Sequence, residues 1–139
     1  MNYEHLVEVN RYNFSSESLD NIRTNAYASN YWPLVYILSD ITKELAYIGE
    51  TADTLTRMLT HLKNNDKSQL TSVHLITSER FNKSATLDIE SALIKYMAAD
   101  GKFSLLNGNL GLSDHNFYQK TELYNQIFKG VWNKLRSQG

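Results

Sequence analysis

Residues 33–49 read PLVYILSDITKELAYIG, and this stretch decides the fold. Two short runs in it, residues 34–38 and 45–48, combine apolar, β-branched and aromatic residues, which is the composition of buried strands. Pro33 precedes the first run, and Gly49 ends the second. Because only a short polar segment separates the runs, we predict that they form a β-hairpin.

The residues after the hairpin predict an amphipathic helix. Its apolar face is marked by the i, i+3, i+4, i+7 spacing of Leu55, Met58, Leu59 and Leu62. We expect the helix to begin at an N-cap on Thr51 and to end near residues 64–65.

A further strand and helix are expected downstream. The stretch TSVHLIT at residues 71–77 alternates with β-branched residues and predicts a third strand. A second helix should run from a cap at Ser84 or Thr86 to about Ala99. A loop over residues 104–111 then leads to a last helix.

The order β-β-α-β-α, followed by a loop and a last helix, indicates a small mixed α/β (α+β) fold. We expect a central, mostly antiparallel, three-stranded sheet flanked by helices. Residues 1–31 are polar and predict an N-terminal arm with a short helix near residues 16–26. Residues 32–112 should form the core. Residues 113–139 should hold a helix over about 116–136 that packs on the core or leads to a linker.

The composition fits one cytoplasmic domain. The chain has 139 residues, of which 42% are apolar, enough for one core. There is no cysteine, which excludes disulfides and thiolate metal sites. The sequence shows neither a signal-peptide pattern nor an apolar run of about 18 residues, so we expect a soluble, cytoplasmic protein without a membrane segment.

The net charge of −1 is not the basic footprint typical of nucleic-acid-binding proteins. The charge is unevenly distributed, however. Residues 1–50 hold three Lys/Arg and seven Asp/Glu, or −4, and the rest of the chain holds eleven and eight, or +3. A difference of this size is typical of an ordinary solvated surface.

Glu90 is the residue that the hydrophobic pattern does not explain. At about 100° per residue it falls within the apolar arc of the second helix, whereas Asp88, Ser91 and Lys95 fall on the opposite side. An unpaired carboxylate that faces the core is costly. We therefore expect Glu90 to be protonated, paired with a cation or bound to a metal ion.

Arg57 and His61 are i, i+4 neighbours on the first helix and are expected to point together, away from its apolar face. Such a pair suits a phosphate, and the helix begins soon after Gly49, where backbone N–H groups attract anions. A solvated helix face is the alternative interpretation. Tyr36 and Tyr47 lie in the predicted strands, where tyrosines are most often core aromatics.

In this order, the residues resemble the GIY-YIG nuclease superfamily, whose name describes two tyrosine-bearing strands. The two motifs stand here as Leu34-Val35-Tyr36 and Tyr47-Ile48-Gly49. The helical arginine of the family matches Arg57, and the His or Tyr one turn later matches His61. The metal-binding glutamate of a later helix matches Glu90.

The resemblance covers about residues 33–110 and has two departures. Leu34 replaces a glycine, and Glu50 stands where some relatives carry lysine, so local phosphate affinity should be lower. The runs FNKSATLDIE (81–90) and KYMAADGKF (95–103) are similar to the amino-terminal GIY-YIG segment of bacterial proteins that continue into a P-loop ATPase or helicase-like domain. The chain itself contains no P-loop motif.

The resemblance implies a metal-dependent endonuclease that hydrolyses DNA phosphodiester bonds by in-line attack of water. One divalent ion, Mg²⁺ or Mn²⁺, would be held by Glu90 and water molecules. Arg57 would neutralise the phosphate. Tyr36 or Tyr47 would take the proton from water, with Arg57, the metal ion or His61 as the cationic neighbour that a tyrosine base needs.

The remaining predicted site residues have supporting roles. A downstream asparagine of the family matches Asn107, with Asn109 as the competing assignment, and it would orient the site. The substrate-binding residues should be Gly49, Thr51, Arg57 and Lys83.

Two other functions compete with nuclease activity. The first is a catalytically weak nucleic-acid-binding module that targets an attached ATPase or helicase-like domain, which the flat charge and Glu50 favour. The second is a protein-interaction domain that uses the aromatic residues of the two terminal segments, although such aromatics more often complete a core.

Overall fold

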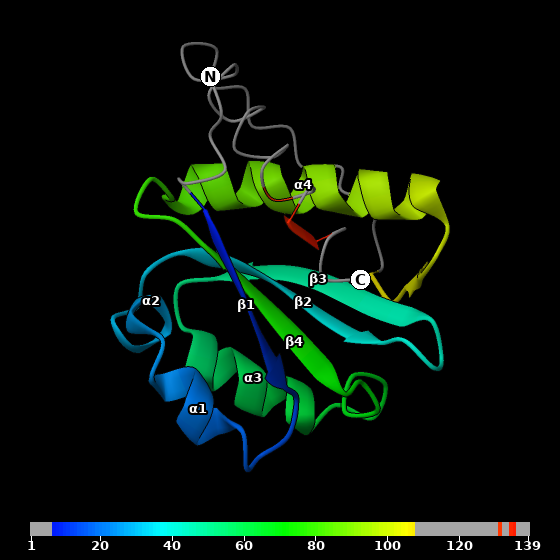
Figure 1. Cartoon of the computed structure of the whole chain (residues 1–139), viewed down its shortest axis with the longest axis horizontal. Helices are drawn as coiled ribbons and strands as arrows, with labels where there is room; N and C mark the ends of the chain where they lie inside the picture. Colours follow the sequence, from blue (N-terminus) through cyan, green and yellow to red (C-terminus); the bar gives the residue numbers. More distant parts are fainter. Residues whose placement is uncertain (1–6, 108–130, 132–133, 136–139) are drawn as a thin grey trace.

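A five-stranded sheet forms the centre of the protein. The computed structural model describes residues 7–107, 131 and 134–135. The strands have the spatial order β1-β4-β2-β3-β5 (Figure 1). Their bounds are β1 Glu8–Asn13, β2 Leu34–Asp40, β3 Leu45–Thr51, β4 Ser72–Thr77 and β5 Ser104–Leu105.

The predicted hairpin is confirmed and lies in the middle of the sheet. Strands β2 and β3 pair antiparallel, with Tyr36 opposite Gly49 and Leu38 opposite Tyr47. β4 pairs antiparallel with the other side of β2, which confirms the third strand. Strand β2 is buried along nearly its whole length because the sheet is covered on both faces.

Helices cover the two faces of the sheet (Figure 1). Helix α4 (Lys83–Asp100) lies on one face, and α1 (Leu19–Arg23) and α3 (Thr54–Leu62) lie on the other, with the short α2 (Ala26–Ser29) beside them. Successive side chains of a strand point to opposite faces. The core is therefore divided into two clusters, one on each face of the sheet.

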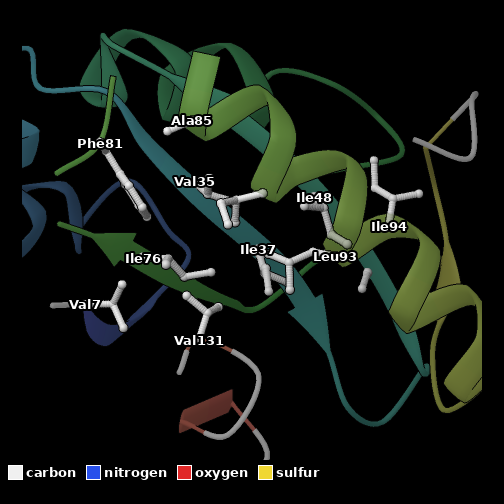
Figure 2. Close-up of a cluster of buried hydrophobic side chains, with 12 residues drawn as sticks. Val7, Val35, Ile37, Ile48, Ile76, Phe81, Ala85, Leu93, Ile94 and Val131 are labelled. Atoms are coloured by element: carbon white, nitrogen blue, oxygen red, sulfur yellow. The ribbon is translucent and has the colours of Figure 1, made fainter. Parts of the chain in front are cut away.

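The cluster under α4 contains the odd-numbered side chains of β2. Figure 2 shows Val35 and Ile37 of β2 and Ile48 of β3 packed against Ala85 and Leu93 of α4. The cluster under α1 and α3 contains the even-numbered side chains Leu34, Tyr36 and Leu38. Tyr36 thus belongs to the face that α3 covers.

Both helices that were predicted after the hairpin are present, but each begins at a different residue. The N-cap of α3 is Asp53, whose side chain accepts the N–H of Thr56, rather than Thr51. The N-cap of α4 is Asn82, whose side chain accepts the N–H of Ala85. Asp and Asn rank above Thr as N-caps, whereas Asn and Ser rank equally.

The predicted N-terminal arm contains structure that the sequence pattern did not indicate. β1 pairs antiparallel with β4, so residues 8–13 form an edge of the sheet, and two short helices replace the single one expected. An edge strand has one unpaired side, and β1 is mostly exposed and polar, so it lacks the apolar alternation of an inner strand. With the two-residue β5, it raises the strand number from the predicted three to five.

The C-terminal helix predicted over residues 116–136 lies largely outside the described residues. Val131 is buried in the cluster under α4. The division into arm, core and C-terminal helix stays a prediction. Among the residues that the structure describes, no helix has the length and apolar character needed to cross a bilayer.

Candidate active site

Two tyrosines from neighbouring strands form the centre of the site. Tyr36 and Tyr47 point to the same face of the sheet and are diagonal neighbours in the register of β2 and β3. Their ring centroids are 6.3 Å apart. Tyr36 is 1% exposed, whereas Tyr47 is only half-buried, so the two phenols face different surroundings.

His61 of α3 packs against both tyrosines. Its Nε2 lies 2.6 Å from the Tyr36 hydroxyl, and its ring centroid lies 5.2 Å from that of Tyr47. The Tyr36 hydroxyl also hydrogen-bonds to Tyr47 and lowers the pKa of the Tyr47 phenol, as a donor does. Which of the two groups donates in the Tyr36–His61 hydrogen bond depends on the tautomer of the imidazole ring.

The position of His61 corrects the predicted face of α3. Met58 is buried, and Leu55 and Leu62 pack against the same core cluster, as predicted. Leu59 is 43% exposed, however, and Thr54 and His61 are buried. His61 and Arg57 therefore differ in burial, because Arg57 is exposed and His61 is in the core. The face is rotated because the tyrosine pair provides a polar partner for a buried imidazole.

Burial keeps His61 neutral. Desolvation, Lys67 and Arg57 together lower its pKa to about 4. At neutral pH the ring is therefore a neutral hydrogen-bond partner of Tyr36 rather than the cationic neighbour that was one alternative for the tyrosine base.

Acidification should destabilise the fold through His61. Its folded-state pKa of about 4 lies below the ordinary 6.5, so its contribution to stability is complete above pH 6.5 and is lost as the pH falls through about 4. The shift corresponds to at most about 3 kcal/mol. Urea denaturation of the wild type and of His61→Gln at several pH values between 7 and 4 measures this contribution.

Glu90 has the opposite effect on the free energy of unfolding over the same pH range. Its pKa is raised in the folded state, so acidification stabilises the fold through this residue. The quantity to compare is therefore the difference in free energy of unfolding between the two proteins. We expect that difference to shrink as the pH falls, and a difference independent of pH would contradict the assignment.

Gly49 lies directly under the Tyr36 ring. A Cβ at this position would stand 2.3 Å from the Tyr36 hydroxyl oxygen and 2.4 Å from the ring carbon that carries it. Only glycine leaves room for the ring, which is itself fixed in the core. The glycine that ends the second motif thus allows the tyrosine of the first motif to reach His61.

Gly49→Ala should displace the Tyr36 ring. We expect it to lower the free energy of unfolding by about 1–3 kcal/mol and to impair any activity that depends on the tyrosine pair. Gly101→Ala is the control, because an added Cβ there has nothing within 4 Å and the cost comes only from the positive φ of 75°. Equal losses of activity in the two variants at matched stability would contradict the steric explanation.

Polar side chains occupy the outer edge of β3. Within the described part of the chain, β5 pairs only with Leu45 and Ala46. Beyond them, Asn107 accepts the N–H of Ile48 at 3.1 Å and donates to the Ile48 carbonyl at 2.7 Å. The next outward-facing N–H, that of Glu50, donates to the carboxylate of Glu90.

Asn107→Ala should destabilise this edge. Both hydrogen bonds to Ile48 would be lost, and the partly buried backbone groups would lack their partner. We expect a loss of about 1–3 kcal/mol in chemical denaturation. The exposed Asn65→Ala is the control, and equal effects of the two substitutions would contradict the role of Asn107.

Glu90 is half-buried and close to a second carboxylate. Its pKa is raised to about 7 by burial and by Glu50, against the opposing effects of Lys83, the Glu50 N–H and Arg57. The prediction that Glu90 stands apart from the apolar pattern is supported by this environment. The side of α4 predicted to be polar is not wholly solvated, however, because Ser91 on that side is buried. Conversely, the aromatic side chain of Tyr96 is 53% exposed. Buried positions lie on more than one side of α4.

Glu50 is paired with Lys83 rather than left as an isolated negative charge. Lys83 Nζ lies 2.6 and 2.8 Å from the two Glu50 carboxylate oxygens, and the hydroxyl of Thr86 donates to one of them at 3.2 Å. Lys83 thus supplies a cation beside the position where some relatives carry lysine. The interaction joins the end of β3 to the first turn of α4.

The predicted substrate-binding residues are placed in different surroundings. Arg57 is exposed and close enough to affect the pKa values of both tyrosines and of Glu90. Thr51 is buried, and its hydroxyl accepts the N–H of Asp53 in the turn before α3. Asn109, the competing assignment to Asn107, lies outside the described residues.

The sequence comparison agrees with this geometry. A family model described as the GIY-YIG catalytic domain matches residues 33–102, which is 70 of the 139 residues. The chain belongs to the GIY-YIG family. Comparison with curated proteins and with solved structures gave no match. Family membership confirms the mixed α/β fold and gives the domain a nuclease type of activity.

Two residues of this GIY-YIG site were not predicted. Lys67 lies over the ring of Tyr47, and Thr86 holds Glu50. Neither contact has a local sequence signal, because each joins side chains far apart in the chain. Among the described residues, no three His, Cys, Asp or Glu side chains are grouped as a metal site.

Proposed function

We propose that this chain is a metal-dependent endonuclease domain that hydrolyses DNA phosphodiester bonds by in-line attack of water. One observation carries the proposal: Arg57, Glu90 and the tyrosine pair, from α3, α4 and the hairpin, lie within electrostatic reach of one another. They supply the cation, the carboxylate and the phenol that this hydrolysis needs. A DNA substrate is consistent with the expected cytoplasmic location.

The residues at Glu90 fit a divalent ion. A half-buried carboxylate whose pKa is raised by burial and by a second carboxylate has an unfavourable negative charge that a cation would relieve. The donors are oxygens only, which suits Mg²⁺ or Mn²⁺ with retained water ligands. Bound by Glu90, the ion would offset the carboxylate charge beside Tyr47 and polarise the phosphoryl oxygens.

Tyr47 is the tyrosine that we assign as proton acceptor. Tyr36 is fully buried, and its pKa is raised far above the ordinary value, chiefly by that burial. The pKa of Tyr47 is also raised, chiefly by burial and Glu90, but Arg57 and the hydrogen bond from Tyr36 oppose the rise. Tyr36 and His61 would therefore support Tyr47 through the hydrogen bond that joins them and through the packing of both rings against Tyr47.

In the proposed reaction, the water oxygen forms the new bond to phosphorus while one water proton passes to the Tyr47 phenolate. The bond from phosphorus to the leaving oxygen breaks, and that oxygen takes a proton from solvent. Arg57, which is exposed, neutralises the phosphate.

Nicking of supercoiled plasmid DNA tests the proposal. We expect nicked product with Mg²⁺ or Mn²⁺ and none in excess EDTA. A parallel titration of DNA binding distinguishes the nucleic-acid-binding module predicted as the alternative. Binding of DNA without cleavage under any of these metal conditions would favour that module, with or without an attached ATPase.

The Glu50–Lys83 pair should protect cleavage from local repulsion of phosphate. Lys83→Met leaves the Glu50 charge uncompensated, and we expect nicking at low salt to slow by about threefold to fivefold, since a partly exposed pair contributes up to about 1 kcal/mol. Adding Glu50→Gln to Lys83→Met should restore most of the rate. If the double variant is as slow as Lys83→Met, Lys83 acts directly on substrate instead.

A further inference from the structure

Lys67 lies in the connection between α3 and β4, and its backbone is fixed on both sides. The side chain of Asn64 accepts the N–H groups of Asp66 and Lys67, both at 3.0 Å. The carbonyl of Lys67 accepts the N–H of Leu70 at 3.1 Å, and Leu70 is buried in the core. The direction of the Lys67 side chain is therefore set by a defined turn.

The ammonium group of Lys67 lies over the ring of Tyr47. Its Nζ is 4.2 Å from the ring centroid, well within the distance of a cation–π interaction. The Lys67 side chain is half-buried, which strengthens the attraction relative to a fully solvated pair.

Several other polar or charged groups face Tyr47. They are Tyr36 from β2, Arg57 and His61 from α3, and Glu90 from α4. His61 is neutral near pH 7 because its pKa is about 4. Arg57 is thus the one cation among these four side chains, and Lys67 is the cation that lies over the Tyr47 ring.

A phenolate spreads part of its negative charge into the aromatic ring, so a cation above the ring attracts the phenolate more strongly than the phenol. We infer that Lys67 is a positioning residue for Tyr47, which holds the ring in place and stabilises the phenolate that accepts the proton from water. The inference rests on the proposed function for its consequence in catalysis, but the pairing itself can be tested without cleavage.

The first experiment measures the titration of Tyr47 directly. Ultraviolet absorbance of phenolate is followed against pH in wild type and in Tyr47→Phe, and the difference gives Tyr47 alone. The same pair of measurements is repeated with Lys67→Met, which keeps an unbranched side chain but removes the charge. We expect Lys67→Met to raise the Tyr47 midpoint by about one pH unit, and Lys67→Arg to leave it close to wild type.

Lys63→Met is the matched control, because Lys63 is an exposed residue at the C-cap of α3 in the same connection. It should not move the midpoint. Lys67→Gln repeats the test should Lys67→Met be poorly folded. An unchanged Tyr47 midpoint in both neutral variants of Lys67 would overturn the inference.

The second experiment measures the pH profile of plasmid nicking. The rise of kcat with pH should move to higher pH by about one unit in Lys67→Met, which is about a tenfold slower rate at neutral pH, and Lys67→Arg should restore it. A rise in KM with an unchanged pH profile would mean that Lys67 only attracts phosphate, which would also overturn the inference. Absence of nicking by the wild type would reject the proposed function, and the Tyr47 titration would still decide the pairing.

Discussion

Glu90→Gln should slow metal-dependent nicking by at least about 100-fold, the usual effect of removing a group that stabilises charge in a transition state. Glutamine keeps the length and shape of the side chain and can still accept the Glu50 N–H. It loses the negative charge on which binding of the divalent ion depends. The measurements are the nicking rate and the affinity for Mn²⁺ by calorimetry.

The same variant should not lose stability. The folded-state pKa of Glu90, about 7, lies above the ordinary 4.5, so its contribution to stability is present below pH 4.5 and is lost as the pH rises through about 7. At pH 8 Glu90→Gln should be at least as stable as wild type. Asp100→Asn, an exposed carboxylate at the end of the same helix, is the control and should nick normally. Full activity of Glu90→Gln would remove Glu90 from the mechanism.

Tyr47→Phe should slow nicking by about 100-fold or more, within the range that general acid–base catalysis contributes. Tyr36→Phe should have a smaller effect on rate but a larger effect on stability. It removes the hydroxyl that hydrogen-bonds to the buried His61 ring, so a buried ring nitrogen loses its partner, at a cost of about 1–3 kcal/mol. Nicking rates and urea denaturation of the two variants separate these outcomes.

The contrast between the two tyrosines is the informative result. If Tyr36→Phe were the slower enzyme while Tyr47→Phe kept near-normal activity, the assignment of Tyr47 as proton acceptor would be wrong. Equal, complete loss in both variants without loss of stability would mean that the pair acts as a unit.

The hairpin, the third strand and the two following helices could be predicted because each has a strong local pattern. The apolar runs around Tyr36 and Tyr47 are short and bounded, as buried strands are. Glu90 could likewise be singled out from the sequence, because it is a charged residue within the apolar arc of its helix. In the structure, burial and Glu50 raise the pKa of the Glu90 carboxyl to about 7, which agrees with its position among apolar residues.

The buried face of α3 could be predicted only in part from its apolar spacing, which placed Leu55, Met58 and Leu62 correctly. Counting only apolar residues assigns Leu59 to the core and His61 to solvent, whereas the fold does the reverse. The partner that makes burial of His61 favourable is Tyr36, 25 residues away, and the pairing depends on the space left by Gly49. β1 was missed for a related reason, since an exposed edge strand has little apolar alternation.

Side-chain contacts between elements far apart in the sequence also could not be predicted from local patterns. Lys83 was predicted to bind substrate, but in the structure it is engaged with Glu50, 33 residues earlier. Asn107, expected to orient the site, binds the backbone of Ile48, 59 residues away, at the outer edge of β3. The roles of these residues in catalysis stay predictions.

The most direct test of the account is to locate Mn²⁺ in a crystal of the protein by its anomalous scattering, at the metal concentration that supports nicking. We expect an anomalous peak in contact with a carboxylate oxygen of Glu90, beside Tyr47 and Arg57, and no such peak in Glu90→Gln. A well-occupied Mn²⁺ elsewhere, with none at Glu90, would contradict the claim that these residues form one metal-dependent site.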